Sequence, residues 1–265
     1  MRGRLTILKL GGSAITMKGR ERTPNNPAIR RLAREIAEAS VFPLIIIHGG
    51  GSYGHPSAER YKIKGGFKEP SQLIGFSKTH EAMASLNSLV VNALISEGVP
   101  ALGMPPSSFM VLSGGRLLNV EKHPLVRALE VGVTPVLYGD VAFDTDMGFT
   151  ILSGDRIAAS LAMRLGAQRI VVGVDVDGLY TDDPKLNPSA RLIRHLTPKK
   201  LKDVEGKIRG SQFPDVTGGM LGKVMELEAA VKSGVEVIIV NALREGNIYK
   251  ALRGEDVVGT KFTKE

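Results

Sequence analysis

Two glycine-rich segments, each directly after a short apolar run, are the parts of this sequence best suited to bind phosphate. The first is Lys9-Leu10-Gly11-Gly12-Ser13, and the second runs from His48 to His55 and contains Gly49-Gly50-Gly51. Because glycine has no side chain, its backbone N–H group can approach a phosphate oxygen closely. Gly11-Gly12 alone also suits an ordinary tight turn. Three successive glycines are harder to explain in that way, so the two segments together favour a phosphate site, although neither matches the Walker P-loop or the dinucleotide fingerprint.

A third glycine-rich segment, residues 215–223, stands before a helical pattern and ends in a lysine. Gly218-Gly219 precede the apolar stripe that begins at Met220, and a helix N-terminus with free N–H groups attracts anions. Lys223 lies one turn into this predicted helix, where its ammonium group can reach the same anion. The alternative for Lys223, taken alone, is a lysine exposed on the helix surface.

Three further polar side chains are candidates for the same chemistry, and each has a simpler alternative. His55 can donate a hydrogen bond to phosphate, more strongly when protonated, but a histidine before proline often only belongs to a turn. Lys18 is either a ligand of the transferred group or an exposed loop lysine beside Arg20 and Arg22. Asp155 precedes a helical pattern, so its simplest role is a helix N-cap.

Five short apolar runs predict the strands that position these residues. They are rich in β-branched residues and nearly continuous, as expected of strands buried on both faces of a parallel sheet. The runs are Leu5–Leu10, Leu44–Ile47, Val133–Leu137, Ile170–Val174 and Val235–Val240. Helical patterns at 26–40, 75–97, 157–166 and 220–234 alternate with them, which indicates an α/β sandwich. Ligands of such sheets bind at the carboxyl ends of the strands, where the glycine-rich segments stand.

Two segments have the pattern of inserted β-hairpins. Ser108–Asn119 turns at Ser113-Gly114-Gly115, and Val141–Leu152 turns at Asp146-Met147-Gly148. The chain shows no internal repeat and no clear linker. We therefore expect one domain, residues 1–265, with an open αβα sandwich, a mostly parallel central sheet and inserted hairpins.

Composition excludes several classes of protein. The 265 residues carry a net charge of +8 and no cysteine, so disulfides, thiolate metal sites and a cysteine nucleophile are excluded. The first ten residues have no long apolar core and no apolar run could cross a membrane, so we expect a cytoplasmic protein without a signal peptide or membrane contact. The positive charge suits a phosphorylated ligand. Nucleic acid is not expected, because the basic residues are scattered and aromatic residues make up only 5%.

Taken together, these segments resemble the amino acid kinase family. The resemblance rests on Lys9–Ser13, His48–Gly51, Ser153-Gly154-Asp155, the stretch Val174–Thr181 with Asp183-Pro184, and Thr217–Lys223, which occur in the family's order along nearly the whole chain. It implies an αβα sandwich with the acceptor in an N-terminal lobe, about 1–150, and ATP in a C-terminal lobe, about 151–265. It also implies a homodimer.

Within the family, the second glycine segment is similar to that of isopentenyl phosphate kinases. Gly51-Ser52-Tyr53-Gly54-His55-Pro56 follows their pattern, with Tyr53 where phenylalanine is usual, and Lys18 also matches. The resemblance implies ATP-dependent phosphorylation of isopentenyl phosphate to the diphosphate. Fosfomycin kinases share much of this loop, so fosfomycin or another phosphonate is an alternative acceptor. A nucleotide-binding sensor or storage protein without turnover is a third possibility.

The resemblance also assigns the expected site residues. Lys9, Lys18, His55, Asp155 and Lys223 are expected to be catalytic, with Asp155 orienting the two lysines Lys9 and Lys223. The acceptor is expected to contact Gly50, Gly51, His55 and Gly154. ATP is expected to contact Lys9, Leu10, Gly11, Gly12, Ser13, Gly51, Asp175, Asp177, Gly178, Tyr180, Gly218, Gly219 and Lys223. Mg²⁺ is expected to accompany ATP, mainly on phosphate oxygens and water, so no protein ligand for a metal is assigned.

An acceptor with a branched alkene tail needs an apolar pocket beside the phosphate site. Phe76, Met83 and Ile151 are candidates for that pocket. The basic segment Arg60–Lys68 is either a solvated loop or a lid that closes over the acceptor, with Gly65-Gly66 as its hinge.

Overall fold

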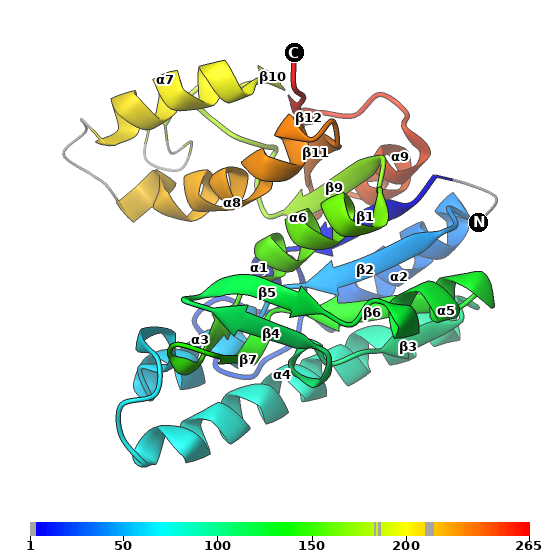
Figure 1. Cartoon of the computed structure of the whole chain (residues 1–265). Coiled ribbons are helices and arrows are strands. Elements are labelled where there is room, and N and C mark those ends of the chain that lie inside the picture. The colour runs from blue at the N-terminus through cyan, green and yellow to red at the C-terminus, as the bar shows by residue number, and fades with distance from the viewer. Residues whose placement is uncertain (1–3, 183, 185–186, 210–214) are drawn as a thin grey trace.

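A mostly parallel sheet forms the centre of the computed structural model, which describes residues 4–182, 184, 187–209 and 215–265 (Figure 1). Within these residues the sheet has eight strands in the order β10-β12-β11-β9-β1-β2-β6-β3, and only the pair of β11 with β12 is antiparallel. Its strands are β1 (Thr6–Leu10), β2 (Leu44–His48), β3 (Ala101–Gly103), β6 (Thr134–Tyr138), β9 (Arg169–Val174), β10 (His195–Leu196), β11 (Glu236–Asn241) and β12 (Gly259–Phe262).

The five predicted strands are confirmed as β1, β2, β6, β9 and β11, which are neighbours at the centre of the sheet. Strands β3, β10 and β12 were not predicted; they have two to four residues each and lie toward the edges of the sheet. Strands this short contain too few residues to show a period. The expected open αβα sandwich with a mostly parallel sheet is therefore confirmed.

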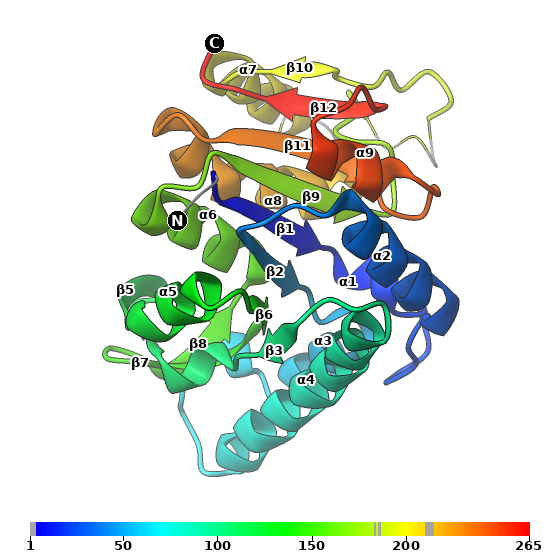
Figure 2. The same cartoon turned by 90° about the vertical axis from the view of Figure 1, so that its right-hand side faces the viewer.

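Helices cover both faces of this sheet (Figure 2). Helices α5, α6 and α8 lie on one face, α2, α4 and α9 lie on the other, and α7 packs on α8. The bounds are α1 (Gly12–Ile15), α2 (Asn26–Ala39), α3 (Gly51–Arg60), α4 (Ser71–Ser96), α5 (His123–Glu130), α6 (Gly154–Leu165), α7 (Pro198–Arg209), α8 (Asp215–Lys232) and α9 (Asn247–Arg253). No helix in the described ranges is both long enough and apolar enough to cross a membrane.

The two faces of the sheet form two separate cores. Along β1, Ile7 packs with residues of α6 and α8, whereas Leu8 and Leu10 pack with residues of α2, α4 and α9. This alternation is the period of two that a strand imposes on its side chains. Since both faces are covered by helices, both sets of residues are apolar, which produces the continuous apolar runs of the sequence.

Several helix boundaries differ from the prediction. The N-cap of α2 is Asn25, whose side chain accepts a hydrogen bond from the Ala28 amide. Helix α4 begins at Ser71 rather than near Gly75, and α8 begins at Asp215, before Gly218-Gly219. Glycine costs a helix roughly 1 kcal/mol relative to alanine, so sequence reasoning places such residues outside helices.

The two predicted hairpins are confirmed, and they combine into a second, smaller sheet. Strands β4 (Met110–Ser113) and β5 (Arg116–Val120) form the first hairpin, and β7 (Asp140–Asp144) and β8 (Gly148–Leu152) form the second. The sheet order is β5-β4-β7-β8, and β4 meets β7 at Leu112 and Asp144.

Asp144 joins the turns of the two hairpins. Its carboxylate accepts hydrogen bonds from the amides of Gly114 at 3.1 Å, Gly115 at 2.7 Å, and Asp146 and Met147 at 2.9 Å each. Burial by itself raises the pKa of Asp144, but these four backbone donors outweigh it and hold the pKa below its usual value. The small sheet therefore depends on an ionised carboxylate.

Asp144→Asn should destabilise the protein by about 1–3 kcal/mol at neutral pH, because an amide accepts through only one oxygen and leaves backbone donors unpaired. The contribution of Asp144 should be complete above its unfolded pKa and should disappear as the pH falls through the lowered folded pKa. Urea unfolding at several pH values measures both effects. Asp146→Asn in the same exposed turn is the control; equal effects of the two substitutions would contradict this account.

Candidate active site

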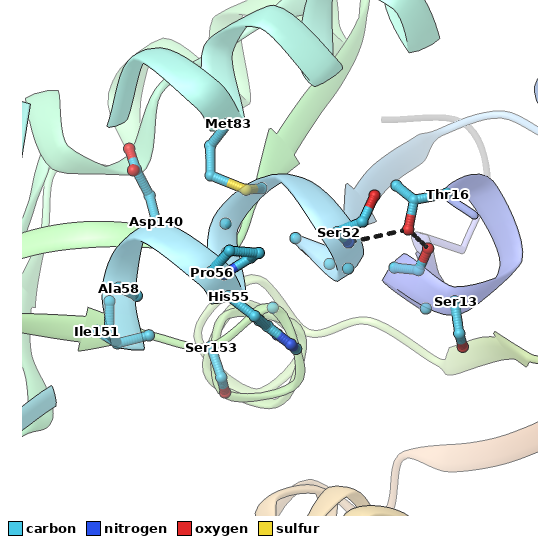
Figure 3. A pocket seen from close by; sticks show the side chains of 18 of the residues that line it. Ser13, Thr16, Ser52, His55, Pro56, Ala58, Met83, Asp140, Ile151 and Ser153 are labelled. Atoms are coloured by element: carbon cyan, nitrogen blue, oxygen red, sulfur yellow. Dashed lines mark hydrogen bonds between the residues drawn. The ribbon is translucent and has the colours of Figure 1, made fainter. Parts of the chain in front are cut away.

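The register of the central strands brings the glycine-rich segments together. Leu10 is paired with His48 on one side and with Gly173 on the other, so β1, β2 and β9 end at the same edge of the sheet. A cavity of about 620 Å³ opens at this edge (Figure 3). The topology therefore places the predicted phosphate segments around one space.

Most of the predicted site residues line this cavity. They are Lys9, Gly11, Gly12, Ser13, Lys18, Gly50, Gly51, His55, Gly154, Asp155 and Lys223. All five residues expected to be catalytic are among them.

Other predicted residues lie elsewhere. Leu10 is buried in a core, and its carbonyl accepts a hydrogen bond from the Gly49 amide. Asp175, Asp177, Gly178, Tyr180 and Gly219 are not part of the lining. Of Gly218 the structure describes only its place in α8, and Asp183 lies outside the described residues.

An ionic cluster of three side chains forms one wall of the cavity. Lys9 near the end of β1 places Nζ 2.7 Å from Oδ1 of Asp155, and Lys223 of α8 places Nζ 3.4 Å from Oδ2. The Lys9 side chain is 2% exposed and that of Asp155 is 7% exposed, whereas Lys223 is 36% exposed. Oδ1 accepts no well-directed hydrogen bond within the described structure, so its attraction to Lys9 is mainly that of two charges.

The surroundings shift the pKa values of this cluster in a consistent way. Burial raises the pKa of Asp155, but the positive charges of Lys9 and Lys223 outweigh burial and hold it below its usual value. Burial also lowers the pKa of Lys9, which the Asp155 carboxylate partly opposes. Asp155 is therefore ionised at neutral pH and holds two cationic side chains beside the cavity.

Asp155 is not the N-cap of α6, which corrects the simpler of the two predicted roles. The N-cap is Ser153, whose side chain accepts a hydrogen bond from the Arg156 amide. Asp155 lies within the first turn, where a carboxylate is stabilised by the helix dipole. Because Ser153 caps the helix, both carboxylate oxygens of Asp155 are available to the two lysines.

The two glycine-rich segments pack so closely against each other that their contact requires glycine, independently of any ligand. A Cβ on Gly12 would lie 2.1 Å from the Gly51 amide nitrogen, and a Cβ on Gly51 would lie 2.1 Å from Oγ1 of Thr16. Gly51 also has a φ of +48°, which favours glycine. The first residues of α3 and α6, Gly51 and Gly154, have no acceptor within their helices, so both amides can face an anion in the cavity.

The segment expected to be a loop around His55 forms helix α3 instead, which begins at Gly51 and continues through Pro56. Gly54 lies against α4, because a Cβ there would be 2.8 Å from the Met83 sulfur. This packing, which no local pattern reveals, explains a helix in a segment rich in glycine and proline. The helix directs His55 into the cavity (Figure 3).

His55 has no hydrogen-bond partner among the residues that the structure describes. Burial lowers its pKa, the positive charges of Lys223 and Lys9 lower it further, and Glu59 opposes them. The imidazole is therefore neutral at pH 7 and able to donate one N–H. A phosphate dianion bound beside it would favour the protonated form again.

The lining of the cavity also includes a group of apolar side chains. Figure 3 shows Met83, Pro56, Ala58 and Ile151 on one side of the view, together with the carboxylate of Asp140. Ser13 lies on the other side, and His55 lies between the two sides. Two of the three predicted apolar residues, Met83 and Ile151, are therefore in place. Phe76 is not part of the lining, because it packs against Phe143 and Phe149.

Lys18 and Asp175 meet at the rim of the cavity. Asp175 accepts a hydrogen bond from Lys18 Nζ at 2.6 Å and another from Ser13 Oγ at 3.0 Å. Lys18 is 64% exposed, so this pair contributes little to stability. Its effect is to hold a third ammonium group next to the first glycine segment.

Asp177 forms a separate polar cluster beyond the end of β9. It accepts hydrogen bonds from Asn241 at 3.0 Å and Arg244 at 2.7 Å, and Tyr180 lies 3.4 Å away. Gly178 packs closely against Thr260, where a Cβ would lie 2.5 Å from Oγ1. These residues form the loop that was expected to surround the nucleotide, and that role stays a prediction.

His48 stabilises the backbone beside the second glycine segment. Its Nε2 lies 3.1 Å from the Asn87 amide nitrogen, which donates, so Nδ1 carries the proton and donates to the Gly49 carbonyl at 3.1 Å. Burial lowers the pKa of His48 to about 4, and His48 is therefore neutral.

Two residues that stabilise the geometry of the site were not predicted from the sequence. Thr16 accepts a hydrogen bond from the Ser52 amide and donates to the Gly12 carbonyl, which joins the two glycine segments. Glu226 accepts a hydrogen bond from Ser153, the cap of α6. A signal for Glu226 exists, since it stands three residues after Lys223 and shares its face of a helix.

The fold is that of an α/β protein, and the chemistry of the cavity suits a polyanionic ligand next to a small apolar group, as expected of a phosphotransferase. Residues 4–241 match the amino acid kinase family, and the chain belongs to that family. It is 42% identical to the isopentenyl phosphate kinase of Methanothermobacter thermautotrophicus, over 98% of this chain and 99% of the relative. The corresponding enzyme of Methanocaldococcus jannaschii is 34% identical, over 97% and 98%.

Solved structures agree with this assignment. An isopentenyl phosphate kinase structure superimposes with a TM-score of 0.86 at 39% identity, covering 98% of this chain and all of the other. A substrate complex of an isopentenyl phosphate kinase gives a TM-score of 0.79 at 32% identity, over 98% and 99% of the two chains.

Asp155→Asn should reduce kcat by about 10²-fold or more, because the two lysines lose the charge that orients them toward a phosphate. Ser153 still caps α6, so the loss cannot be attributed to capping. Steady-state kinetics together with thermal unfolding separate activity from stability, and Asp256→Asn at an exposed position is the control. A folded Asp155→Asn variant with an unchanged kcat would contradict the assigned role.

Proposed function

We propose that this chain transfers the γ-phosphoryl group of ATP to isopentenyl phosphate and forms isopentenyl diphosphate and ADP. The observation that carries the proposal is that the lining of one cavity combines a charged part, the cluster of Lys9, Lys223 and Asp155, with an apolar part that includes Met83 and Ile151. Isopentenyl phosphate likewise combines a charged part with an apolar part. The identity of 42% with an isopentenyl phosphate kinase over nearly the whole chain supports the same acceptor.

The reaction needs charge and alignment more than it needs a base. A phosphate monoester has a second pKa near 6 and is mostly a dianion at neutral pH, so the attacking oxygen already carries negative charge. This oxygen forms a bond to the γ-phosphorus while the bond to the β,γ-bridging oxygen breaks and ADP leaves. Catalysis then consists of stabilising negative charge on three phosphoryl groups.

Each cationic residue has a place in this scheme. Lys9, fixed by Asp155, would contact the β,γ-bridge, and Lys223 would contact the γ-phosphoryl group from the other side. Lys18, at the rim, would stabilise the transferred group. The amides of Gly12 and Gly51 would complete the set of donors around the phosphates, whereas the Gly11 amide, also expected there, donates to the Gly173 carbonyl at 2.7 Å. His55 would hold the acceptor phosphate together with Gly50 and Gly154.

The residues present fit a Mg²⁺ ion carried by ATP rather than by the protein. Within the described part of the chain, no group of three histidine or carboxylate side chains could hold a metal ion. The carboxylates that line the cavity already have partners, since Asp155 is engaged by Lys9 and Lys223, Asp140 by His80 and Glu21 by Arg60. When bound, Mg²⁺ would neutralise part of the phosphate charge, and the lysines of the chain would neutralise the rest.

The proposal assigns the acceptor to the first half of the chain and ATP to the second. Residues 1–150 supply β1, β2, β6 and the apolar side chains of the cavity other than Ile151 and Leu152, and would bind the acceptor. Residues 151–265 supply α6, α8, β9 and β11, and would bind ATP, with Asp175, Asp177, Gly178 and Tyr180 on the nucleotide. Both halves share one sheet, so we treat them as lobes of one domain. A homodimer and a cytoplasmic location remain predictions.

An ADP-release assay tests the proposed acceptor. It compares isopentenyl phosphate, dimethylallyl phosphate, fosfomycin and UMP at equal ATP concentration. We expect isopentenyl phosphate to give the highest kcat/KM of the four. A clear preference for fosfomycin or UMP would reject the proposed acceptor, and binding of ATP without turnover of any acceptor would point to a sensor.

His55→Ala should mainly impair use of the acceptor. Loss of a charge-assisted hydrogen bond worth about 1.5–3 kcal/mol lowers kcat/KM for isopentenyl phosphate roughly 10- to 150-fold. The Kd for ATP should hardly change, and His55→Gln should recover part of the loss because an amide can also donate. His123→Ala, at an exposed histidine on α5, is the control. Weaker ATP binding with normal acceptor kinetics would place His55 at the nucleotide instead.

A further inference from the structure

Glu226 of α8 joins the helix that carries Lys223 to the helix that carries Asp155. One of its carboxylate oxygens, Oε2, accepts a hydrogen bond from the Ser153 hydroxyl, and the other, Oε1, lies 3.1 Å from a guanidinium nitrogen of Arg156. Ser153 is the cap of α6 and Arg156 lies in its first turn. A single carboxylate thus binds the N-terminal end of α6 through two different residues.

The position of the Lys223 side chain depends on this connection more than the position of Lys9 does. Lys9 is fixed by its buried position on β1, whereas Lys223 is 36% exposed and its Nζ is 3.4 Å from Asp155. Helix α8 contains glycine at positions 219 and 222, just before Lys223, and glycine weakens a helix by roughly 1 kcal/mol at each position. The location of the Lys223 ammonium group is therefore set by how α8 is held against α6.

Apolar packing alone does not fix that location. Val224 and Leu227 are fully buried in the core beneath α8 and hold the helix onto the sheet. Apolar contacts are not directional and tolerate small rotations and shifts of a helix. Glu226 lies one turn after Lys223, and its directional hydrogen bonds fix the rotation of α8 about its axis.

The same contacts extend to the acceptor side of the molecule. A second guanidinium nitrogen of Arg156 donates to the Gly115 carbonyl, in the turn between β4 and β5. The amide of Gly115 donates to Asp144, which ties the two hairpins together. Arg156 and Glu226 therefore connect the small sheet, the first turn of α6 and the helix of Lys223.

We propose that Glu226 is a positioning residue for phosphoryl transfer, which acts through Ser153 and Arg156 to hold Lys223 opposite Asp155. This inference rests on the proposed kinase function. Glu226 itself carries a negative charge near a site for phosphates, so its role is not to attract ATP. If only its charge mattered, neutral glutamine in its place would strengthen anion binding and would not slow the reaction.

The test compares Glu226→Gln with Glu228→Gln on the same helix. Glu228 pairs with Lys232 at 2.9 Å, so its substitution removes a charge and an ion pair of α8 without touching α6. We expect Glu226→Gln to lower kcat by about 10- to 100-fold, the effect of a small misplacement of a catalytic group. The Kd for ATP should stay within about twofold, and Glu228→Gln should behave like the unmodified protein.

A double-substitution cycle shows whether Glu226 acts through Lys223. In a Lys223→Ala background, Glu226→Gln should reduce kcat by less than about twofold further, because the group it positions is already gone. Arg156→Lys keeps the positive charge but loses the planar set of guanidinium N–H donors. It should cause an intermediate loss of kcat in the otherwise unmodified protein.

Amide hydrogen exchange of residues 219–224 gives a readout that does not require turnover. We expect faster exchange in Glu226→Gln than in Glu228→Gln. An unchanged kcat and unchanged exchange, tighter ATP binding with faster turnover, or full additivity with Lys223→Ala would each overturn the inference. If the unmodified protein phosphorylates no acceptor, the proposed function has failed instead, and the exchange rates alone decide whether Glu226 holds α8.

Discussion

The Asp155 carboxylate between the ammonium groups of Lys9 and Lys223 is the interaction on which the rest of the site depends. Moving an ion out of water costs several kcal/mol, and two members of this cluster are almost fully buried. The cost is tolerable only if all three groups stay together, and they come from β1, α6 and α8. The parallel register of β1 with its neighbours, the Ser153 cap of α6 and the packing of α8 all serve to bring the three charges to one place.

This arrangement suits a reaction whose nucleophile is itself an anion. The site combines cations, glycine amides and two helix N-termini, and the cavity contains no carboxylate free of a cationic or hydrogen-bonding partner among the described residues. A phosphate acceptor at neutral pH needs alignment and charge compensation rather than deprotonation. The pKa of His55 is lowered first by burial and then by the same positive charges of Lys223 and Lys9.

The parts of this fold that can be predicted from the sequence are those in which the residue type alone indicates the local environment. Buried parallel strands are apolar on both faces, so β1, β2, β6, β9 and β11 were identifiable from their apolar runs, and the Gly114-Gly115 turn identified a hairpin. Helix α3 was not identifiable, because its glycines and proline disfavour a helix locally and its stability comes from packing on α4, including the contact of Gly54 with Met83. The spacing of Glu226 from Lys223 indicates a shared helix face, but its contact with Ser153, 73 residues away in the sequence, cannot be read from local spacing. Lys9, His55, Asp155 and Lys223 were identified through glycine-rich segments and family resemblance, and the structure places them around one cavity.

The most direct test of this account is the ionisation of Asp155, followed through its carboxyl ¹³C chemical shift during a pH titration. Burial alone would raise its pKa above that of an exposed aspartate, whereas the two lysines are expected to hold it below that value. Lys223→Met should move the pKa upward, because one of the compensating charges is lost. A carboxyl group with a raised pKa in the unmodified protein, or a pKa indifferent to Lys223→Met, would contradict the central role of this cluster.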